Sequence, residues 1–161
     1  MKAKEVLALL LEDNLQIAFL ESMTGGKLIS ELVKHPGASK VCQLGLVLYS
    51  NEMKEKFTSI TRAEIVEFGV VSKEIALLLA TNAKRLGRSD IGVGVTGSAG
   101  PTAEKGSFVG EVWIGIVFLS KQYFFQLKLG DYSRELIIEK TVVAIYDFLL
   151  ELLTNYNNSK I

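Results

Sequence analysis

The sequence of 161 residues has little of the residues from which many active sites are built: one cysteine, Cys42, and one histidine, His35. A single cysteine excludes an internal disulfide and any metal site made of several cysteines. Cys42 stands in an apolar run, which predicts a buried small side chain and, without disulfides, a cytoplasmic location. His35 precedes Pro36 in a turn, and one histidine argues against both a Ser–His–Asp triad and histidine-bound zinc. We therefore predict no metal site.

Net charge is also lacking, because 18 Lys and Arg residues balance 18 Asp and Glu residues. This balance gives no support for a nucleic-acid partner. The longest uninterrupted apolar run, 112–119, is too short to span a bilayer, so no membrane partner is predicted. A hydrophobic fraction of 48% and a mean hydropathy of +0.28 exclude a disordered chain. The length fits one domain.

Hydrophobic periodicity alternates between the patterns of strands and helices. Strands are expected at 16–20, 41–49, 91–95, 112–119 and 122–129. Helices are expected at about 4–12, through 28–33, at 51–57, from 61, over 72–87 and along a stripe from 137 to 152. Strands that alternate with helices, followed by a hairpin, predict a single α/β domain over 1–161. Its mixed sheet would be covered by helices on both faces, with an ordered core over about 4–153.

Local signals refine this pattern. Thr61 and Glu64 have the spacing of a capping box, and Ser72 is expected to cap the following helix. Residues 120–121 are expected to form the two-residue turn of the hairpin. The polar tail from Thr154 is expected to fray.

Two glycine-bearing turns follow predicted strands, at the carboxyl ends where α/β sheets bind ligands. They read Ser22-Met23-Thr24-Gly25-Gly26 and Thr96-Gly97-Ser98-Ala99-Gly100. Glycine lets backbone N–H groups approach an anion closely, and a following helix adds the positive end of its dipole. Neither turn is a Walker A loop or a G-x-G-x-x-G fingerprint. The turns indicate a phosphate or oxyanion site, with ordinary turn chemistry as the alternative.

A nucleophilic Ser22 would need a base other than histidine. Tyr49 and Lys54 follow the second predicted strand and could supply it. A lysine acts as a base only where burial or neighbouring charge lowers its pKa from about 10.4, as in Ser–Lys acyl-transfer sites. The alternative is a surface lysine, because the charged Glu55 and Lys56 adjoin Lys54.

Five motifs, in order, resemble those of the CinA C-terminal domain family. Residues 21–26 read E-S-M-T-G-G against E-S-C-T-G-G, and residues 45–54 read G-L-V-L-Y-S-N-E-M-K against G-x-V-x-Y-S-N-E-x-K. Residues 69–74, 96–101 and 109–114 are similar to G-A-V-S-E-E, T-G-I-A-G-P and V-G-T-V-W-I. The resemblance extends from about residue 4 to 153, nearly the whole chain.

The resemblance implies a three-layer α/β/α fold and nicotinamide-nucleotide amidase activity. Such an enzyme converts nicotinamide mononucleotide and water to nicotinic acid mononucleotide and ammonia, a step in pyridine nucleotide salvage. The resemblance also implies a small-molecule nucleotide as substrate, no cofactor, a homo-oligomer, and the stand-alone form of the domain. Carried over residue by residue, the serine nucleophile is Ser22, acting with Tyr49 and Lys54.

In the mechanism that we expect, Lys54 takes the Ser22 proton directly or through Tyr49, and Ser22 attacks the carboxamide. Backbone N–H groups near Thr24, Gly25 and Gly26 would stabilise the oxyanion. The turn 96–100 would hold the 5′-phosphate or line the opposite wall. Arg134 resembles a family arginine and would pair with the phosphate, the alternative being an exposed arginine at a helix start.

Departures from the family pattern keep a second function open. Met23 replaces the cysteine of the first motif, the loop 102–108 differs from G-G-T-x-E-K-P, and Ile138 stands where a second arginine is common. The alternative is a non-catalytic nucleotide-binding module, or a competence-related interaction module, of the same fold.

Overall fold

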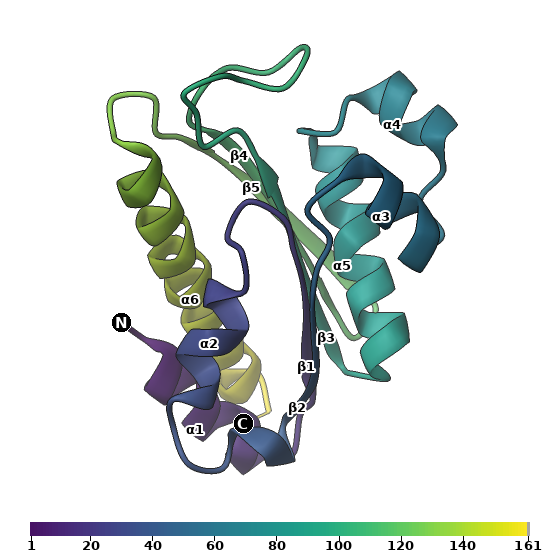
Figure 1. Ribbon diagram of the computed structural model, residues 1–161. Helices are drawn as coiled ribbons and strands as arrows, with labels where there is room; N and C mark the ends of the chain where they lie inside the picture. The colour runs from purple at the N-terminus through teal and green to yellow at the C-terminus, as the bar shows by residue number, and fades with distance from the viewer. Residues whose placement is uncertain (161) are drawn as a thin grey trace.

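The computed structural model describes residues 1–160, which form a five-stranded sheet with helices on both faces (Figure 1). The strands are β1 (Ile17–Glu21), β2 (Cys42–Val47), β3 (Ile91–Gly97), β4 (Glu111–Phe118) and β5 (Lys121–Lys128). The α-helices are α1 (Ala3–Asp13), α2 (Lys27–Val33), α3 (Asn51–Phe57), α4 (Arg62–Phe68), α5 (Lys73–Gly87) and α6 (Arg134–Asn158). A short 3-10 helix, η1 (Ala38–Lys40), precedes β2.

The sheet has the strand order β2-β1-β3-β4-β5. β1 pairs in parallel with both β2 and β3, so that Phe19 lies opposite Gly45 on one side and Val93 on the other. β4 and β5 complete the sheet as antiparallel strands. From β1 the chain goes first to β2 and later to β3 on the opposite side. The carboxyl end of β1 is therefore the switch point where α/β sheets bind ligands.

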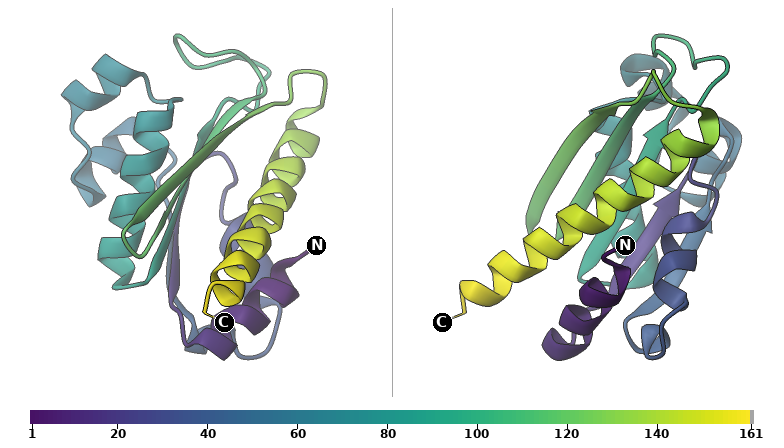
Figure 2. Two further views of the ribbon diagram at one scale, coloured as in Figure 1. Left: turned by 180° about the vertical axis from the view of Figure 1, so that it is seen from behind. Right: turned by 90° about the vertical axis from the view of Figure 1, so that its left-hand side faces the viewer.

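The sheet is the middle layer of three. α1, α2 and α6 cover one face and α3, α4 and α5 lie on the other, with α6 crossing its face diagonally (Figure 2). Along β1, Ile17 and Phe19 belong to the core on the α6 side, whereas Ala18 and Leu20 belong to the core on the α5 side. Side chains alternate between the faces of a strand, so a strand that is apolar throughout can bury both faces. The predicted three-layer α/β/α fold with a mixed sheet is confirmed.

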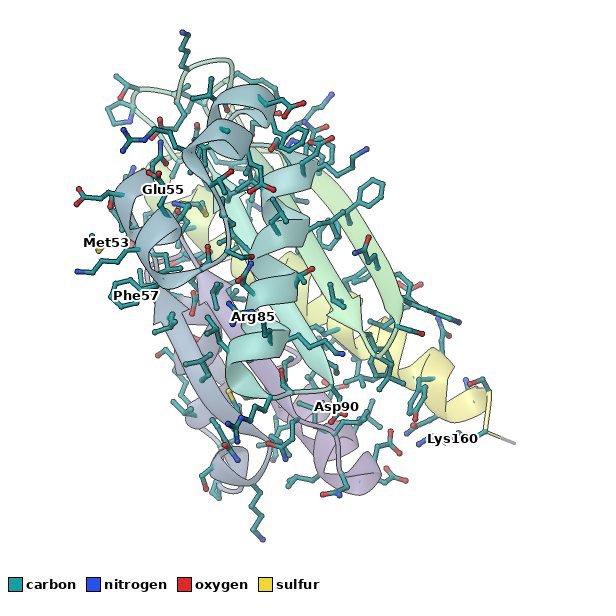
Figure 3. All side chains as sticks on the ribbon, turned by 90° about the vertical axis from the view of Figure 1, so that its right-hand side faces the viewer. Met53, Glu55, Phe57, Arg85, Asp90 and Lys160 are labelled. Atoms are coloured by element: carbon teal, nitrogen blue, oxygen red, sulfur yellow. The ribbon has the colours of Figure 1, made fainter. Side chains whose placement is uncertain are left out.

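α5 lies directly on the backbone of the sheet (Figure 3). A Cβ atom at Gly92 would overlap the Ala80 carbonyl oxygen, and one at Gly94 or Gly115 would overlap that of Ala76. Glycine in the strands and alanine in the helix therefore permit this approach. The close packing fixes α5, and through it the segment that leads back into β3.

The helix starts confirm their capping signals. Thr61 and Glu64 form a complete capping box at α4, and the Ser72 hydroxyl accepts a hydrogen bond from the Ile75 N–H at the start of α5. Cys42 is buried, as predicted, and burial raises the pKa of its thiol. The second strand is shorter than expected, at 42–47.

Two further boundary predictions, for the hairpin turn and for the tail, are wrong. The hairpin turn consists of Leu119 and Ser120, one residue earlier than expected, because Phe118 pairs with Lys121. Leu119 has a φ of 53°, a left-handed conformation that a hairpin turn imposes but that a leucine does not signal.

The tail does not fray at Thr154, since α6 continues to Asn158. Tyr156 packs edge-on against Phe118, with ring centroids 5.0 Å apart. The Lys160 ammonium, at the far end of α6 in Figure 3, lies 2.6 Å from an Asp13 carboxylate oxygen. Tertiary contacts thus hold a segment whose polar composition favours fraying. Within residues 1–160, no helix combines the length and apolar character needed to cross a membrane.

Candidate active site

Ser22 follows β1 directly and opens the turn that leads into α2. Its side chain is buried, and its carbonyl oxygen accepts a hydrogen bond of 3.1 Å from the Gly25 N–H. Gly25 and Gly26 have φ angles of 60° and 95°, which side-chain-bearing residues rarely adopt. The two glycines therefore allow the tight turn that holds Ser22 at the end of the strand.

The carboxylate of Glu21 organises the same turn from inside the protein. Glu21 is buried, and its carboxylate accepts hydrogen bonds from the Thr24 hydroxyl at 2.7 Å and from the N–H groups of Gly26, Leu28 and Ile29 at 3.2, 2.9 and 3.2 Å. A carboxylate is the charge that a helix N-terminus favours. The chain thus supplies its own anion at the start of α2.

This arrangement corrects the expectation that Thr24, Gly25 and Gly26 face a ligand anion as a group. The Gly25 N–H donates to Ser22, while the Gly26 N–H and the Thr24 hydroxyl donate to Glu21. In the described part of the chain, no protein acceptor is found for the N–H groups of Met23 and Thr24. Within residues 23–26, the N–H groups of Met23 and Thr24 are therefore the ones left to bind a ligand.

Lys54 lies on α3, the helix that Ser50 caps after β2. Its side chain is 1% exposed, and its Nζ donates hydrogen bonds to the Leu48 carbonyl oxygen at 2.8 Å and to Ser22 Oγ at 3.2 Å. Burial lowers the pKa of Lys54 from 10.5 to about 8, while the negative charge of Glu104 works in the opposite direction. The alternative of a surface lysine is therefore wrong.

Tyr49 occupies the rim rather than the space between Ser22 and Lys54. Its side chain is 62% exposed, and its hydroxyl accepts a hydrogen bond of 2.8 Å from Arg134. Arg134 also donates to the Gly100 carbonyl oxygen at 2.6 Å. One guanidinium therefore ties together the segment after β2, the segment after β3 and the start of α6.

The second glycine-bearing turn contributes unequally to the site. The Thr96 hydroxyl is buried and donates a hydrogen bond of 2.7 Å to the Val70 carbonyl oxygen, which gives it a structural partner within the protein. Ser98 Oγ accepts a hydrogen bond of 3.0 Å from the Glu104 N–H and holds the following loop. At Gly100, with a φ of 85°, a Cβ atom would collide with Val109.

A pocket of about 110 Å³ opens where these segments meet. Its lining residues are Ser22, Met23, Tyr49, Gly97, Ser98, Ala99, Gly100, Thr102, Glu104 and Arg134. A larger neighbouring pocket of about 440 Å³ is lined by residues of α4, the segment 69–71 and the loop 104–106, and it shares Glu104. The chain segments after β1, β2 and β3 and the start of α6 therefore converge on one small cleft above Ser22.

Sequence reasoning assigned no role to two carboxylates of this site. Glu21 is the last residue of a buried strand and stands shortly before the start of α2. Because a helix N-terminus favours a negative charge, the capping role of Glu21 could have been predicted from the sequence. Glu104 stands in an exposed loop, and only the fold brings it to the pocket and within electrostatic reach of Lys54. The described residues contain no cluster of three or more His, Cys, Asp or Glu side chains suited to a metal ion.

The family model described as the CinA C-terminal domain matches residues 1–153. The chain belongs to the CinA C-terminal domain family. Proteins named competence-damage inducible protein are among its relatives. The protein of Listeria innocua is 42% identical over 69% of this chain and 27% of its own length. The protein of Thermoanaerobacter pseudethanolicus is 39% identical over 89% of this chain and 35% of its own length. The chain thus spans about a third of the curated relatives that it matches.

Solved structures of CinA proteins share the fold. The competence/damage inducible protein of Agrobacterium tumefaciens superposes with a TM-score of 0.89 at 28% identity, covering 94% of this chain and 93% of that one. A competence or damage-inducible protein of Enterobacter asburiae gives a TM-score of 0.90 over 94% and 96%, at 24% identity, which bears on the fold alone. The CinA fold is therefore preserved over nearly the whole chain.

Proposed function

We propose that this CinA domain hydrolyses the carboxamide of nicotinamide mononucleotide, with Ser22 as nucleophile and Lys54 as base. The observation that carries the proposal is the buried contact of 3.2 Å between Lys54 Nζ and Ser22 Oγ. Burial favours the uncharged amine, which is the form that can accept a proton from an alcohol. The family resemblance of the surrounding motifs supports the choice of substrate.

The reaction then runs in two halves. The neutral Lys54 amine takes the Ser22 proton while Oγ bonds to the carboxamide carbon, and the N–H groups of Met23 and Thr24, unpaired within residues 1–160, are our candidates to stabilise the developing oxyanion. Lys54 returns the proton to the leaving nitrogen, the C–N bond breaks, and ammonia departs. Water then attacks the acyl-enzyme, frees Ser22 and gives the carboxylic acid. Because Lys54 contacts Ser22 directly, no proton relay through Tyr49 is required.

The small size of the pocket supports placing only the ring end of a mononucleotide next to Ser22. A pocket of about 110 Å³ takes a single aromatic ring with its carboxamide, and the rest of the nucleotide would extend over the rim. Arg134 donates one N–H group to the Gly100 carbonyl oxygen and one to the Tyr49 hydroxyl, which leaves three of its five N–H donors for a phosphate. The N–H groups at the start of α2 already bind the Glu21 carboxylate, so Arg134 is a stronger candidate than the start of α2 for binding the phosphate.

Purified protein is expected to release ammonia and nicotinic acid mononucleotide from nicotinamide mononucleotide. Ser22→Ala should reduce turnover by about 10³-fold or more while leaving the fold intact, because a nucleophile has no substitute. Ser30→Ala, an exposed serine of α2, is the matched control and should retain activity. Wild-type turnover by Ser22→Ala would rule out the serine mechanism.

A non-catalytic nucleotide-binding module is the second candidate. The departures in the loop 102–108, next to the pocket, favour it, and the names of the relatives state no reaction. Such a module would be stabilised against heat by the nucleotide without releasing ammonia. Measuring both quantities on the same preparation separates the two functions.

A further inference from the structure

The candidate pocket carries two charged lining groups of opposite sign that do not neutralise each other. Glu104 and Arg134 are its charged lining residues in the described chain, and the salt bridges of residues 1–160 do not join them. Arg134 is held by Gly100 and Tyr49 instead. A pocket with separated positive and negative groups complements a ligand that itself carries both an anion and a cation.

The position of Glu104 is set by hydrogen bonds of its loop. Its backbone N–H donates to Ser98 Oγ at 3.0 Å, and Ser98 Oγ lies 3.1 Å from Ser107 Oγ. This anchors the loop beside the wall formed by Gly97 and Ser98. The Glu104 carboxylate also lies within electrostatic reach of Lys54, and Glu104 lines the same pocket as Ser22, so its negative charge acts on that pocket.

We infer that Glu104 makes this site selective for a carboxamide attached to a positively charged aromatic ring. The inference rests on the proposed amidase function and specifies the charge of its substrate. The ring nitrogen of nicotinamide carries a formal positive charge once it is bonded to ribose, whereas the ring of the dihydro form is neutral. Both forms have the same carboxamide, ribose and phosphate, so only the ring charge and planarity distinguish them.

Glu104 is exposed, so its attraction to a cationic ring is that of a solvent-screened charge pair and is expected to be modest. The exposed ring of Tyr49 adds an aromatic face on the same rim, a surface that attracts cations. Hydrolysis replaces a neutral carboxamide by a carboxylate beside Glu104. The repulsion between these two negative groups favours release of the product.

Isothermal titration calorimetry on Ser22→Ala, which removes turnover, tests the inference. Nicotinamide mononucleotide is expected to bind about fivefold more tightly than its dihydro form, which corresponds to about 1 kcal/mol. Adding Glu104→Gln should abolish this preference, Glu104→Lys should reverse it, and higher ionic strength should weaken it. Glu67→Gln, a carboxylate of the neighbouring pocket, is the matched control and should keep the preference.

Equal binding of the two ligands to Ser22→Ala, or a preference that survives Glu104→Gln and Glu104→Lys, would overturn the inference. Thermal unfolding of each variant shows that it is folded, and Glu104 is exposed, so its replacement leaves the core unchanged. The proposed function fails by a separate result, namely no ammonia from the chain with Ser22 intact. The binding preference is measured without turnover, so the two failures are distinguishable.

Discussion

At the scale of single residues, the buried Lys54 is the feature on which the proposed function and the expected stability both depend. Among residues 1–160, its ammonium group finds the Leu48 carbonyl oxygen and Ser22 Oγ as its hydrogen-bond partners, which is less than water offers a cation. The lowered pKa follows from this deficit, and the lowered pKa in turn makes the amine a usable base near neutral pH.

The pH dependence of turnover follows from that pKa. With a pKa of about 8, Lys54 is mostly protonated at pH 7 and mostly neutral at pH 9. We expect kcat/KM for nicotinamide mononucleotide to rise with pH and to reach half of its plateau near pH 8. Glu104→Gln removes a charge that raises this pKa, so its profile should lie at lower pH. A profile that stays flat across this range would exclude Lys54 as the base.

The burial of Lys54, which favours the proposed reaction, should lower the free energy of unfolding at neutral pH. A lowering of the pKa from 10.5 to about 8 corresponds to a cost of about 3 kcal/mol for folding with a charged Lys54. This cost is present in full below pH 8, where Lys54 is protonated in both the folded and the unfolded chain. Between pH 8 and 10.5 Lys54 is protonated in the unfolded chain alone, so stability rises with pH and the cost has disappeared above pH 10.5. We expect Lys54→Met to be about 1–3 kcal/mol more stable than the wild type at pH 7, and less so at pH 10.

Urea unfolding at the two pH values measures this difference. Lys56→Met changes an exposed lysine two residues away and should leave the free energy of unfolding within about 0.5 kcal/mol of the wild type. A less stable Lys54→Met at pH 7 would mean that the two hydrogen bonds of Lys54 outweigh its burial.

The candidate residues could be predicted from the sequence only in part. Ser22 and Lys54 were recognisable from their motifs, but the burial of Lys54 was not, because its neighbours Glu55 and Lys56 are typical of a surface. The fold buries Lys54 by bringing a residue 32 positions earlier against it. Tyr49 shares the motif of Lys54 and Thr96 belongs to the motif at 96–101, yet the structure puts Tyr49 at the rim of the pocket and gives the Thr96 hydroxyl a structural partner in Val70.

At the scale of elements, the contact between α5 and the sheet is the most demanding. Gly94 faces the backbone of α5, which cannot move without displacing the whole helix. We expect Gly94→Ala to lower the free energy of unfolding by about 2 kcal/mol or more, because overpacking against backbone has no side-chain rotation to relieve it. Chemical denaturation measures the loss.

Gly45→Ala is the matched comparison for this substitution. Its Cβ would meet the Ile29 side chain, which can rotate, so the loss should be smaller than at Gly94. A loss at Gly94 equal to or below that at Gly45 would contradict the rigid contact that we describe.

Element boundaries show where local sequence signals stop. The capping residues Thr61 and Ser72 determined the starts of α4 and α5, because a cap is a local interaction. The end of α6 depends on Phe118 and Asp13, which are distant in the sequence, so its polar composition was misleading.

At the scale of the whole molecule, the arrangement of strands determines where chemistry is possible. The alternation of apolar strands and helices was enough to predict a mixed sheet between two helical layers. It could not give the order of the strands, which depends on how distant segments pair. The homo-oligomer stays a prediction, and sedimentation velocity at several concentrations tests it.

The direct packing of α5 against the backbone of β3 and β4 has a consequence for how the molecule unfolds. Where helix and strand backbones touch, no layer of side chains can loosen first to admit solvent. We expect the amide hydrogens of β3 and of the middle of α5 to be the last to exchange in deuterated water, at a rate set by global unfolding. Those of the exposed loop 101–107 should exchange orders of magnitude sooner, as NMR or mass spectrometry would record. Early exchange in β3 would show that the sheet separates from α5 before the rest unfolds. If the amides of β3 stay protected, the strand next to the pocket remains folded while the exposed loop 101–107 moves, and that motion would let small molecules enter and leave.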